Sequence, residues 1–379
     1  MSDSIDVAIT ECSTYEIDQL EEAMEKVCNS ANMIDVKDKK VLLKPNILSD
    51  ASSEKAITTH PEVVRALIRV LFRRGAKEVL VGDSPGIHGP SFFPRTSGIG
   101  KVCIEEGAKW CEFARDPVMR NIPGVFNLKL PLPKVMDEAD IIISVAKMKT
   151  HQLMYATGSV KNIFGMVVGL HKSACHMLYP TSNSFAKMLS GLYALIKPQF
   201  AVMDCIVAME GPGPAAGLPR HVGLLMASND PTALDATQSL IMGYDPYAIP
   251  LTKALLNRRL TMWRNLTEIN YPLLNGNELI IKDFKRIEQR KKENLIGTLI
   301  IPLLTRKFKM RHRQKEPKPL FDRSICIGCN KCVEICPAKA IVLDKEKKAV
   351  CSYNKCIRCY CCHEVCPVNA IEIEERVEA

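Results

Sequence analysis

The sequence predicts an α/β protein, with a large domain built on a mainly parallel sheet and a small C-terminal α+β domain. Short apolar runs alternate with segments of helical periodicity over residues 1–285, as in parallel α/β units. Apolar residues make up 47% and charged residues 25% of the 379 residues, which is the balance of a globular chain. Ten of the 16 cysteines lie between Cys326 and Cys366. We therefore predict a large domain over 1–285, a basic linker over 286–318 and a small domain over 319–379.

The elements of the large domain follow from its apolar pattern. Short apolar runs predict buried strands at residues 7–9, 40–43, 78–82, 139–145, 200–203 and 222–227. Helical spacing is found over residues 17–28, from Val63 to Leu71, and from Leu234 to Ile241. The second of these helices starts after Thr59-His60-Pro61-Glu62, where an early proline is tolerated, and Gly75 is placed to end it.

Composition and charge exclude several classes of protein. No apolar run approaches the ~20 residues that a membrane-spanning helix needs, and the acidic start lacks the features of a secretory signal. We therefore expect a cytoplasmic location and no transmembrane segment. Residues 282–318 hold 13 Lys or Arg against four Asp or Glu. This excess fits a docking patch for an acidic partner or membrane surface or, more simply, a solvated helix and tether. Without interleaved aromatic residues or a recognisable motif, we predict no nucleic-acid partner.

The C-terminal cysteines carry the clearest chemical signal. In a reducing compartment such a group indicates metal or redox chemistry rather than disulfides. The spacing Cys-x₂-Cys-x₂-Cys-x₃-Cys-Pro occurs twice, over residues 326–337 and 356–367. In this pattern three cysteines of each run hold one [4Fe–4S] cluster and the fourth holds the other cluster. We predict two [4Fe–4S] clusters with crossed ligands, which are Cys326, Cys329, Cys332 and Cys366 for the first and Cys356, Cys359, Cys362 and Cys336 for the second.

Zinc is the alternative for paired cysteines, but a duplicated triplet with a fourth cysteine before proline is not a zinc spacing. Short helices are expected after each proline, over 338–341 and 368–371, with short strands over 322–325 and 341–343, near Cys351, and over 371–373. Cys351 and Cys361 are left over and are interpreted as small hydrophobes or bystander thiols.

Basic and polar residues follow the predicted strands of the large domain, where open α/β sheets bind ligands. Residues 144–176 contain four lysines and three histidines without any Asp or Glu. Such cationic density is stable beside an anion such as a carboxylate or phosphate, and Gly158, Gly165 and Gly169 would allow close backbone approach to it. We predict Lys149, His151 and Lys161 as catalytic residues. Substrate-binding residues are predicted to be Lys44, Asn46, Asp83, Lys147, Lys172 and His176. The simpler alternative is separate surface lysines and histidines that cap or pack.

The chain resembles known families in two regions. The last 60 residues resemble a bacterial two-cluster ferredoxin, with every cluster ligand matched. The preceding residues are similar to the domain-of-unknown-function 362 family in Leu43–Asn46, Gly82–Gly86, Lys147–His151, Gly158–Asn162 and Asn229–Asp235. That resemblance implies an α/β domain and no particular reaction. A fainter similarity to the lactate racemase superfamily involves His151, Lys161 and His176. There the matching lysine tethers a nickel pincer nucleotide, but Gly158-Ser159 replaces the expected paired glycines.

Two classes of function fit these patterns. In the first, the chain is an oxidoreductase whose clusters deliver electrons to an anionic substrate or a further, unknown cofactor held by residues 144–176. A lysine or histidine would then act as general acid. In the second, it is a non-catalytic electron carrier or partner-binding module. A racemase-like, non-redox enzyme with accessory clusters is a further alternative. A redox partner protein is expected in the first two cases.

Overall fold

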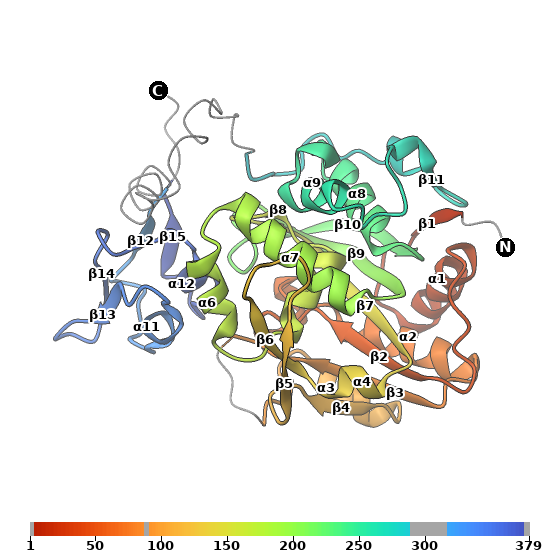
Figure 1. Cartoon of the computed structure of the whole chain (residues 1–379), viewed down its shortest axis with the longest axis horizontal. Coiled ribbons are helices and arrows are strands. Elements are labelled where there is room, and N and C mark those ends of the chain that lie inside the picture. The colour runs from red at the N-terminus through yellow and green to blue at the C-terminus, as the bar shows by residue number, and fades with distance from the viewer. Residues whose placement is uncertain (1–3, 87–90, 289–316, 375–379) are drawn as a thin grey trace.

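The computed structural model describes residues 4–86, 91–288 and 317–374 (Figure 1). The basic linker predicted over 286–318 therefore lies outside the described residues, apart from its ends at 286–288 and 317–318. Within the described part, a large α/β body precedes a small cysteine-rich module, which we define as residues 317–374. Figure 1 shows this module in blue beside α6 (His171–Leu178).

A nine-stranded sheet crosses the described part of the large body in the order β11-β1-β10-β9-β7-β2-β3-β4, with β8 paired to β7. Five pairings are parallel (β1–β11, β2–β3, β2–β7, β3–β4 and β7–β9) and three are antiparallel. The mainly parallel α/β fold is thus confirmed. The strands are β1 (Ile5–Glu11), β2 (Lys40–Pro45), β3 (Glu78–Asp83), β4 (Lys109–Glu112), β7 (Ile141–His151), β8 (Tyr155–Ala156), β9 (Phe200–Glu210), β10 (Leu218–Ser228) and β11 (Ile269–Asn270).

Helices cover both faces of the sheet, so its central strands are apolar on both sides. In β2, Leu42 packs into one core while Val41 and Leu43 pack into the other, as the alternation of a strand requires. One core holds α1 (Ile17–Ser30), α2 (Pro61–Arg73) and α3 (Ile99–Glu105). The opposite face carries α5 (Ser159–Asn162), α7 (Ser182–Ile196), α8 (Pro231–Ile241), α9 (Pro250–Asn257), the short α4 (Val135–Glu138) and a hairpin of β5 (Pro117–Asn121) and β6 (Lys129–Pro133).

The strand β7 runs six residues past the end predicted for it, so the basic residues expected in a loop lie on a strand. All of its residues are buried. Its register places Lys147 opposite Asp204 of β9. The Lys147 Nζ lies 2.8 Å from the Asp204 Oδ2, and both side chains are almost fully shielded from solvent. Tyr15 donates a 3.0 Å hydrogen bond to the other carboxylate oxygen of Asp204. Lys147 is therefore neutralised inside the sheet.

The cysteine-rich module consists of two similar halves. Its elements are β12 (Pro319–Phe321), α11 (Lys331–Ile335), β13 (Ile341–Leu343), β14 (Ala349–Cys351), α12 (Cys361–Glu364) and β15 (Ile371–Ile373). The pairs β12–β15 and β13–β14 are antiparallel. The strands over 341–343 and 371–373 and the strand near Cys351 lie where the sequence predicts them, whereas the strand expected over 322–325 lies at 319–321.

The helices expected after the two Cys-Pro pairs are wrong. The short helices lie before the prolines instead, and each contains the third cysteine of its run. After Cys336 and Cys366 the chain makes a tight turn through the left-handed residues Lys339 and Asn369 and enters β13 and β15 directly. A positive φ in each turn prevents a helix there.

The buried Lys147–Asp204 ion pair gives a prediction about stability. We expect Asp204→Ala to lower the free energy of unfolding by about 3–5 kcal/mol, because it leaves a buried ammonium group without its counterion. Urea denaturation followed by circular dichroism measures this. Asp283→Ala is the matched control, since Asp283 pairs with Arg220 at an exposed position. An equal, small loss for both variants would contradict the prediction.

Candidate functional site

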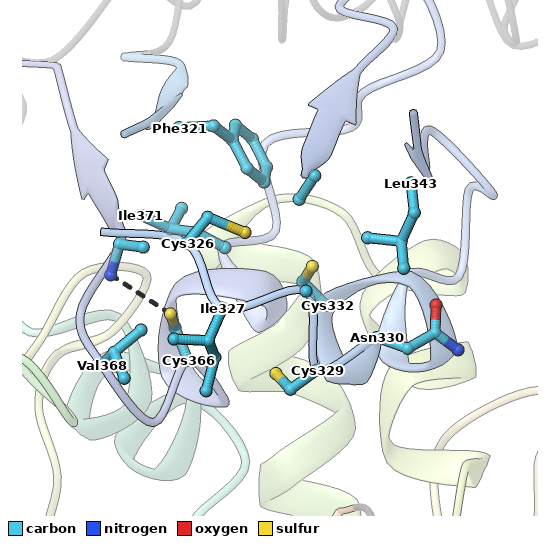
Figure 2. A pocket seen from close by; sticks show the side chains of 13 residues that line it. Phe321, Cys326, Ile327, Cys329, Asn330, Cys332, Leu343, Cys366, Val368 and Ile371 are labelled. Carbon is cyan, nitrogen blue, oxygen red and sulfur yellow. Dashed lines mark hydrogen bonds between the residues drawn. The ribbon is translucent and has the colours of Figure 1, made fainter. Parts of the chain in front are cut away.

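The eight cysteines of the two runs form two sets in the structure. Cys326, Cys329, Cys332 and Cys366 line one cavity of about 370 Å³, and Figure 2 shows their side chains surrounding one space. Cys336, Cys356, Cys359 and Cys362 line a second cavity of about 330 Å³. The fourth cysteine of each run thus lies with the triplet of the other run. We call these the first and second thiol sets.

Both thiol sets fit an iron–sulfur cluster in chemistry and surroundings. Each offers four sulfur donors in a mainly apolar cavity. The Ala340 N–H donates to the Cys336 sulfur and the Ala370 N–H donates to the Cys366 sulfur, each over 3.2 Å. Hydrogen bonds to the sulfurs are among the features that tune such clusters. Among the described residues, no three His, Cys, Asp or Glu side chains are grouped so that they could hold a single metal ion.

The two leftover cysteines of the module pack against apolar clusters, which fits their interpretation as small hydrophobes. Cys351 and Cys361 both line the cavity of the second thiol set. Burial and a hydrogen bond with Cys359 raise the pKa of the Cys361 thiol well above its ordinary value, with the hydrogen bond the larger cause. The second cavity is therefore lined by six cysteines, of which the spacing selects four.

A third and larger cavity, of about 800 Å³, lies between the large body and the cysteine-rich module. We call it the lysine-lined cavity. It brings together seven of the nine residues predicted for the catalytic and substrate-binding sites, namely Lys44, Asn46, Asp83, Lys149, Lys161, Lys172 and His176. The module contributes Ile335, Cys361, Glu364 and Val365 to its wall. The cavity thus joins the carboxyl end of the sheet to the second half of the module.

A buried network fixes the floor of this cavity. The Lys44 Nζ lies 2.9 Å from the Asp83 Oδ2 and also donates to the Pro45 carbonyl oxygen over 2.7 Å. Asn162 donates to the Lys44 carbonyl oxygen over 2.7 Å, and its Oδ1 accepts from the Asn46 amide over 3.2 Å. Burial lowers the pKa of Lys44 and raises that of Asp83, and the ion pair opposes both shifts. These residues therefore satisfy one another and hold β2, β3 and α5 together.

The other three lysines of the cavity have no carboxylate within 4 Å among the residues that the structure describes. Lys149 donates to the Asn46 Oδ1 over 2.9 Å and to the Ile57 carbonyl oxygen over 2.6 Å, both neutral acceptors. Lys172 donates to the Ser84 carbonyl oxygen. Burial lowers the pKa of Lys172 to about 7, and it also lowers the pKa values of Lys149 and Lys161. The lining holds four lysines against two carboxylates, Asp83 and Glu364.

The position of Lys161 depends on how α5 begins. The Asp235 carboxylate accepts the backbone N–H groups of Ser159 and Val160 over 2.5 and 3.0 Å. A Cβ at Gly158 would lie 2.5 Å from that carboxylate, so only glycine allows this close approach. Likewise, a Cβ at Gly165 would lie 2.3 Å from the Asp83 Oδ1. Both glycines thus make room for buried side chains of the protein itself.

Two predicted residues do not line the cavity. Lys147 is held in the ion pair with Asp204, so the structure separates it from the other predicted substrate-binding residues. His151 is buried behind the cavity wall, where its Nδ1 accepts the backbone N–H groups of Leu153 and Met154 over 3.1 and 3.3 Å. His151 therefore carries its proton on Nε2, which lies 3.5 Å from the Glu364 Oε1. Burial keeps the pKa of His151 well below its ordinary value.

His176 lines the cavity and also packs against aromatic rings. Its ring stacks on Phe185 with centroids 4.4 Å apart and meets Phe164 edge-on at 6.1 Å. Both the binding role and the packing alternative that the sequence left open are compatible with this position.

His363 ties the cysteine-rich module to the large body. The His363 Nε2 lies 3.0 Å from the Pro212 carbonyl oxygen, and its Nδ1 lies 2.6 Å from the carbonyl oxygen of Ile371. Because both neighbours are acceptors, both contacts are hydrogen bonds only when both ring nitrogens carry a proton. His363 directly follows Cys362, so this contact fixes the second thiol set relative to the sheet.

Sequence reasoning missed Glu364 and Asn162 as parts of the site. Asn162 stands next to the predicted Lys161, and its place in the Gly158–Asn162 stretch was the available signal. Glu364 lies between two cysteine ligands of the module, 203 positions after Lys161 in the sequence. Only the packing of the module against the sheet brings its carboxyl group into the cavity.

The fold and these sites define an α/β protein with a C-terminal iron–sulfur module. Residues 41–239 match the family described as domain of unknown function (DUF362), and residues 325–376 match the 4Fe-4S dicluster domain. The first match spans more than half of the chain. The chain belongs to the DUF362 family and carries an iron–sulfur dicluster domain, as its sequence predicts.

The proteins similar to the chain include a curated relative and two solved structures. A thylakoid-associated protein of Synechocystis sp. is 33% identical over 247 residues, 65% of this chain and 75% of that protein. A crystal structure of a Thermotoga maritima protein has a TM-score of 0.37 at 15% identity, covering 56% of this chain and 55% of that one. The lactate racemase apoprotein of Thermoanaerobacterium thermosaccharolyticum has a TM-score of 0.39 at 12% identity, covering 60% and 54%.

These two structural similarities are too low to support an argument about activity, and the chain spans just over half the length of each solved structure. In the described residues, no helix is both long and apolar enough to cross a membrane. The cytoplasmic location stays a prediction, because the name of the relative concerns the relative alone.

The close packing at Gly165 gives a second prediction. We expect Gly165→Ala to destabilise the protein by about 1–3 kcal/mol, because the added methyl group overlaps the Lys44–Asp83 pair. Thermal denaturation measures the loss. Gly86→Ala is the matched control at the same cavity, since its Cβ would meet only the Ile335 Cδ1 at an ordinary 3.5 Å. If the Gly165→Ala variant is as stable as Gly86→Ala, the prediction is wrong, because the Lys44–Asp83 pair then moves aside at little cost.

Proposed function

We propose that the chain is an iron–sulfur electron-transfer protein that delivers electrons to a small anionic substrate bound in the lysine-lined cavity. One observation carries this proposal: three lysines without a carboxylate partner among the described residues share a cavity with the wall of the second thiol set. Unpaired ammonium groups in a sheltered space attract an anion strongly, since the low local dielectric strengthens the interaction. The same space adjoins the part of the chain that would hold a redox group.

Two [4Fe–4S] clusters are proposed, with Cys326, Cys329, Cys332 and Cys366 holding one and Cys336, Cys356, Cys359 and Cys362 holding the other. When bound, such clusters supply one-electron transfer over a wide range of potentials. Cys351 and Cys361 are proposed as further wall residues of the second set. A redox partner protein would supply the electrons.

Within the cavity, Lys161 is proposed to contact the anion directly, and Lys149 and Lys172 to hold it from the sheet and from α6. The Lys161 Nζ has no hydrogen-bond acceptor or carboxylate partner among the described residues. Lys149 is anchored by two neutral acceptors, which fix its position and leave its charge uncompensated. His151 is proposed as a positioning residue that directs its Nε2–H toward Glu364, in place of the catalytic role expected from the sequence.

The first test is substrate-dependent reoxidation of the clusters. Protein reconstituted without oxygen is reduced with dithionite, desalted, and mixed with small organic carboxylates and phosphates while the visible absorbance is followed. We expect one class of anion to reoxidise the protein, and Lys161→Ala to slow this at least about tenfold. One lost hydrogen bond to a charged group accounts for that factor.

Lys187→Ala is the control for that substitution, because Lys187 is exposed on α7 away from the cavity. If no anion reoxidises the clusters and Lys161→Ala alters only the binding of a protein partner, the chain is a non-catalytic carrier and the proposal fails.

The lowered pKa of Lys172 predicts a pH dependence of anion binding. With its pKa near 7, Lys172 is charged below that pH and neutral above it. We therefore expect the affinity for sulfate to fall as the pH rises from about 6 to 8, because one attractive charge is lost. Isothermal titration calorimetry measures the affinity, and sulfate keeps a constant charge in this range. The Lys172→Met variant should bind sulfate more weakly and without this pH dependence. If its pH profile is unchanged, another group causes the pH dependence and the prediction is wrong.

A further inference from the structure

The two thiol sets differ in their relation to the lysine-lined cavity. Cys361, the first residue of α12, lines both that cavity and the cavity of the second thiol set. Among the described residues, none lines both the lysine-lined cavity and the cavity of the first set. The second set thus shares a wall residue with the lysine-lined cavity, whereas the first set shares none among the residues that the structure describes.

Apolar side chains make up most of the wall that the module forms between the second set and the lysines. Ile335, Cys359 and Cys361 are all buried and pack into one small cluster, with Val365 against it. Ile335 and Val365 each directly precede the fourth cysteine of a run and also line the lysine-lined cavity. Charges on the two sides of such a wall interact strongly, because little water lies between them to screen the field.

The first set, by contrast, opens toward solvent. Cys329 is exposed, and the neighbouring Ile327 is 63% exposed. Water beside this set screens its charge from the rest of the molecule. The near-identical runs of cysteines therefore lie in unlike electrostatic surroundings.

We infer that anion binding in the lysine-lined cavity is coupled to the redox state of the group held by the second thiol set, and not to that of the first. This regulation rests on the proposed function. Reduction adds one electron, supplied in the test by an electrode, and therefore one negative charge; no bond forms or breaks. That charge repels an anion held by Lys161, so the anion binds more weakly to the reduced protein.

By reciprocity, the bound anion must lower the reduction potential of the same group. The coupling has a definite order. The anion binds most tightly while the second group is oxidised. Once the anion is bound, reduction of that group is less favourable, because the added electron and the anion repel each other. Glu364 lies on the same wall and adds to the negative potential there, whereas Lys161 and Lys149 oppose it.

The test uses the full-length, anaerobically reconstituted protein and sulfate as the probe. Potentials of both clusters are measured electrochemically, with EPR detection, with sulfate and with chloride of equal ionic strength. We expect sulfate to lower one of the two potentials. Calorimetry on oxidised and reduced protein should give the matching loss of affinity, tenfold for a shift of about 59 mV.

Two substitutions identify the cluster that responds without removing a ligand. Ile327→Glu adds a negative charge beside the first set and should lower that potential only. Lys161→Gln removes a positive charge beside the second set, so it should lower the other potential and abolish the effect of sulfate. The sulfate-sensitive cluster should be the one that Lys161→Gln shifts.

Other outcomes overturn the inference in distinguishable ways. If sulfate binds but shifts both potentials equally, shifts the potential that Ile327→Glu moves, or shifts neither, the coupling is wrong while the anion site stands. If calorimetry detects no sulfate binding in either redox state, the proposed function fails and this inference fails with it.

Discussion

Three lysines in one sheltered cavity, without a carboxylate within 4 Å among the described residues, are the constraint on which the site depends. Ammonium groups taken out of water without counterions are costly, and their mutual repulsion adds to the cost. Lys149 shows how the fold tolerates this, because neutral oxygens of Asn46 and Ile57 replace part of its hydration. These lysines are therefore already positioned to bind an anion, and the cavity does not need to rearrange.

The rest of the cavity is organised so that these charges stay uncompensated. Asp83 is committed to Lys44 and also accepts the backbone N–H groups of Ile47 and Ser84, each over 2.7 Å. Asp204 is committed to Lys147 on the neighbouring strands. Asp83 and Asp204 are therefore held in ion pairs that stabilise the sheet. Among the described residues of the module, Glu364 alone adds a carboxylate to the cavity lining.

Much of the fold and part of the site could be predicted from local patterns. Strands buried on both faces are apolar runs, and ligands of a duplicated cluster motif have fixed spacing, so both are visible in sequence. Lys44, Asn46 and Asp83 lie at or just past the ends of such strands and were found in this way. Lys147 was grouped with Lys149 by proximity alone, because its partner Asp204 is 57 positions away and only the register of β7 with β9 pairs them.

What escaped prediction depends on long-range packing or on backbone detail. Glu364 belongs to the site because His363 binds a carbonyl oxygen 151 positions earlier. The short helices of the module were predicted to follow the prolines. Lys339 and Asn369 have left-handed backbone conformations there, which prevents a helix. Neither a contact between residues far apart in the sequence nor the φ angle of a single residue produces a periodic pattern of apolar residues.

The internal duplication of the module has a consequence for how it can sit on the sheet. Its two halves are nearly interchangeable in backbone, yet Lys331 and Val333 of one occupy the positions of Cys361 and His363 in the other. If the module packed on the sheet through its other half, a lysine would face an already cationic pocket and the contact with the Pro212 carbonyl oxygen would be lost. The sequence differences between the halves therefore allow the module to pack against the sheet in one orientation.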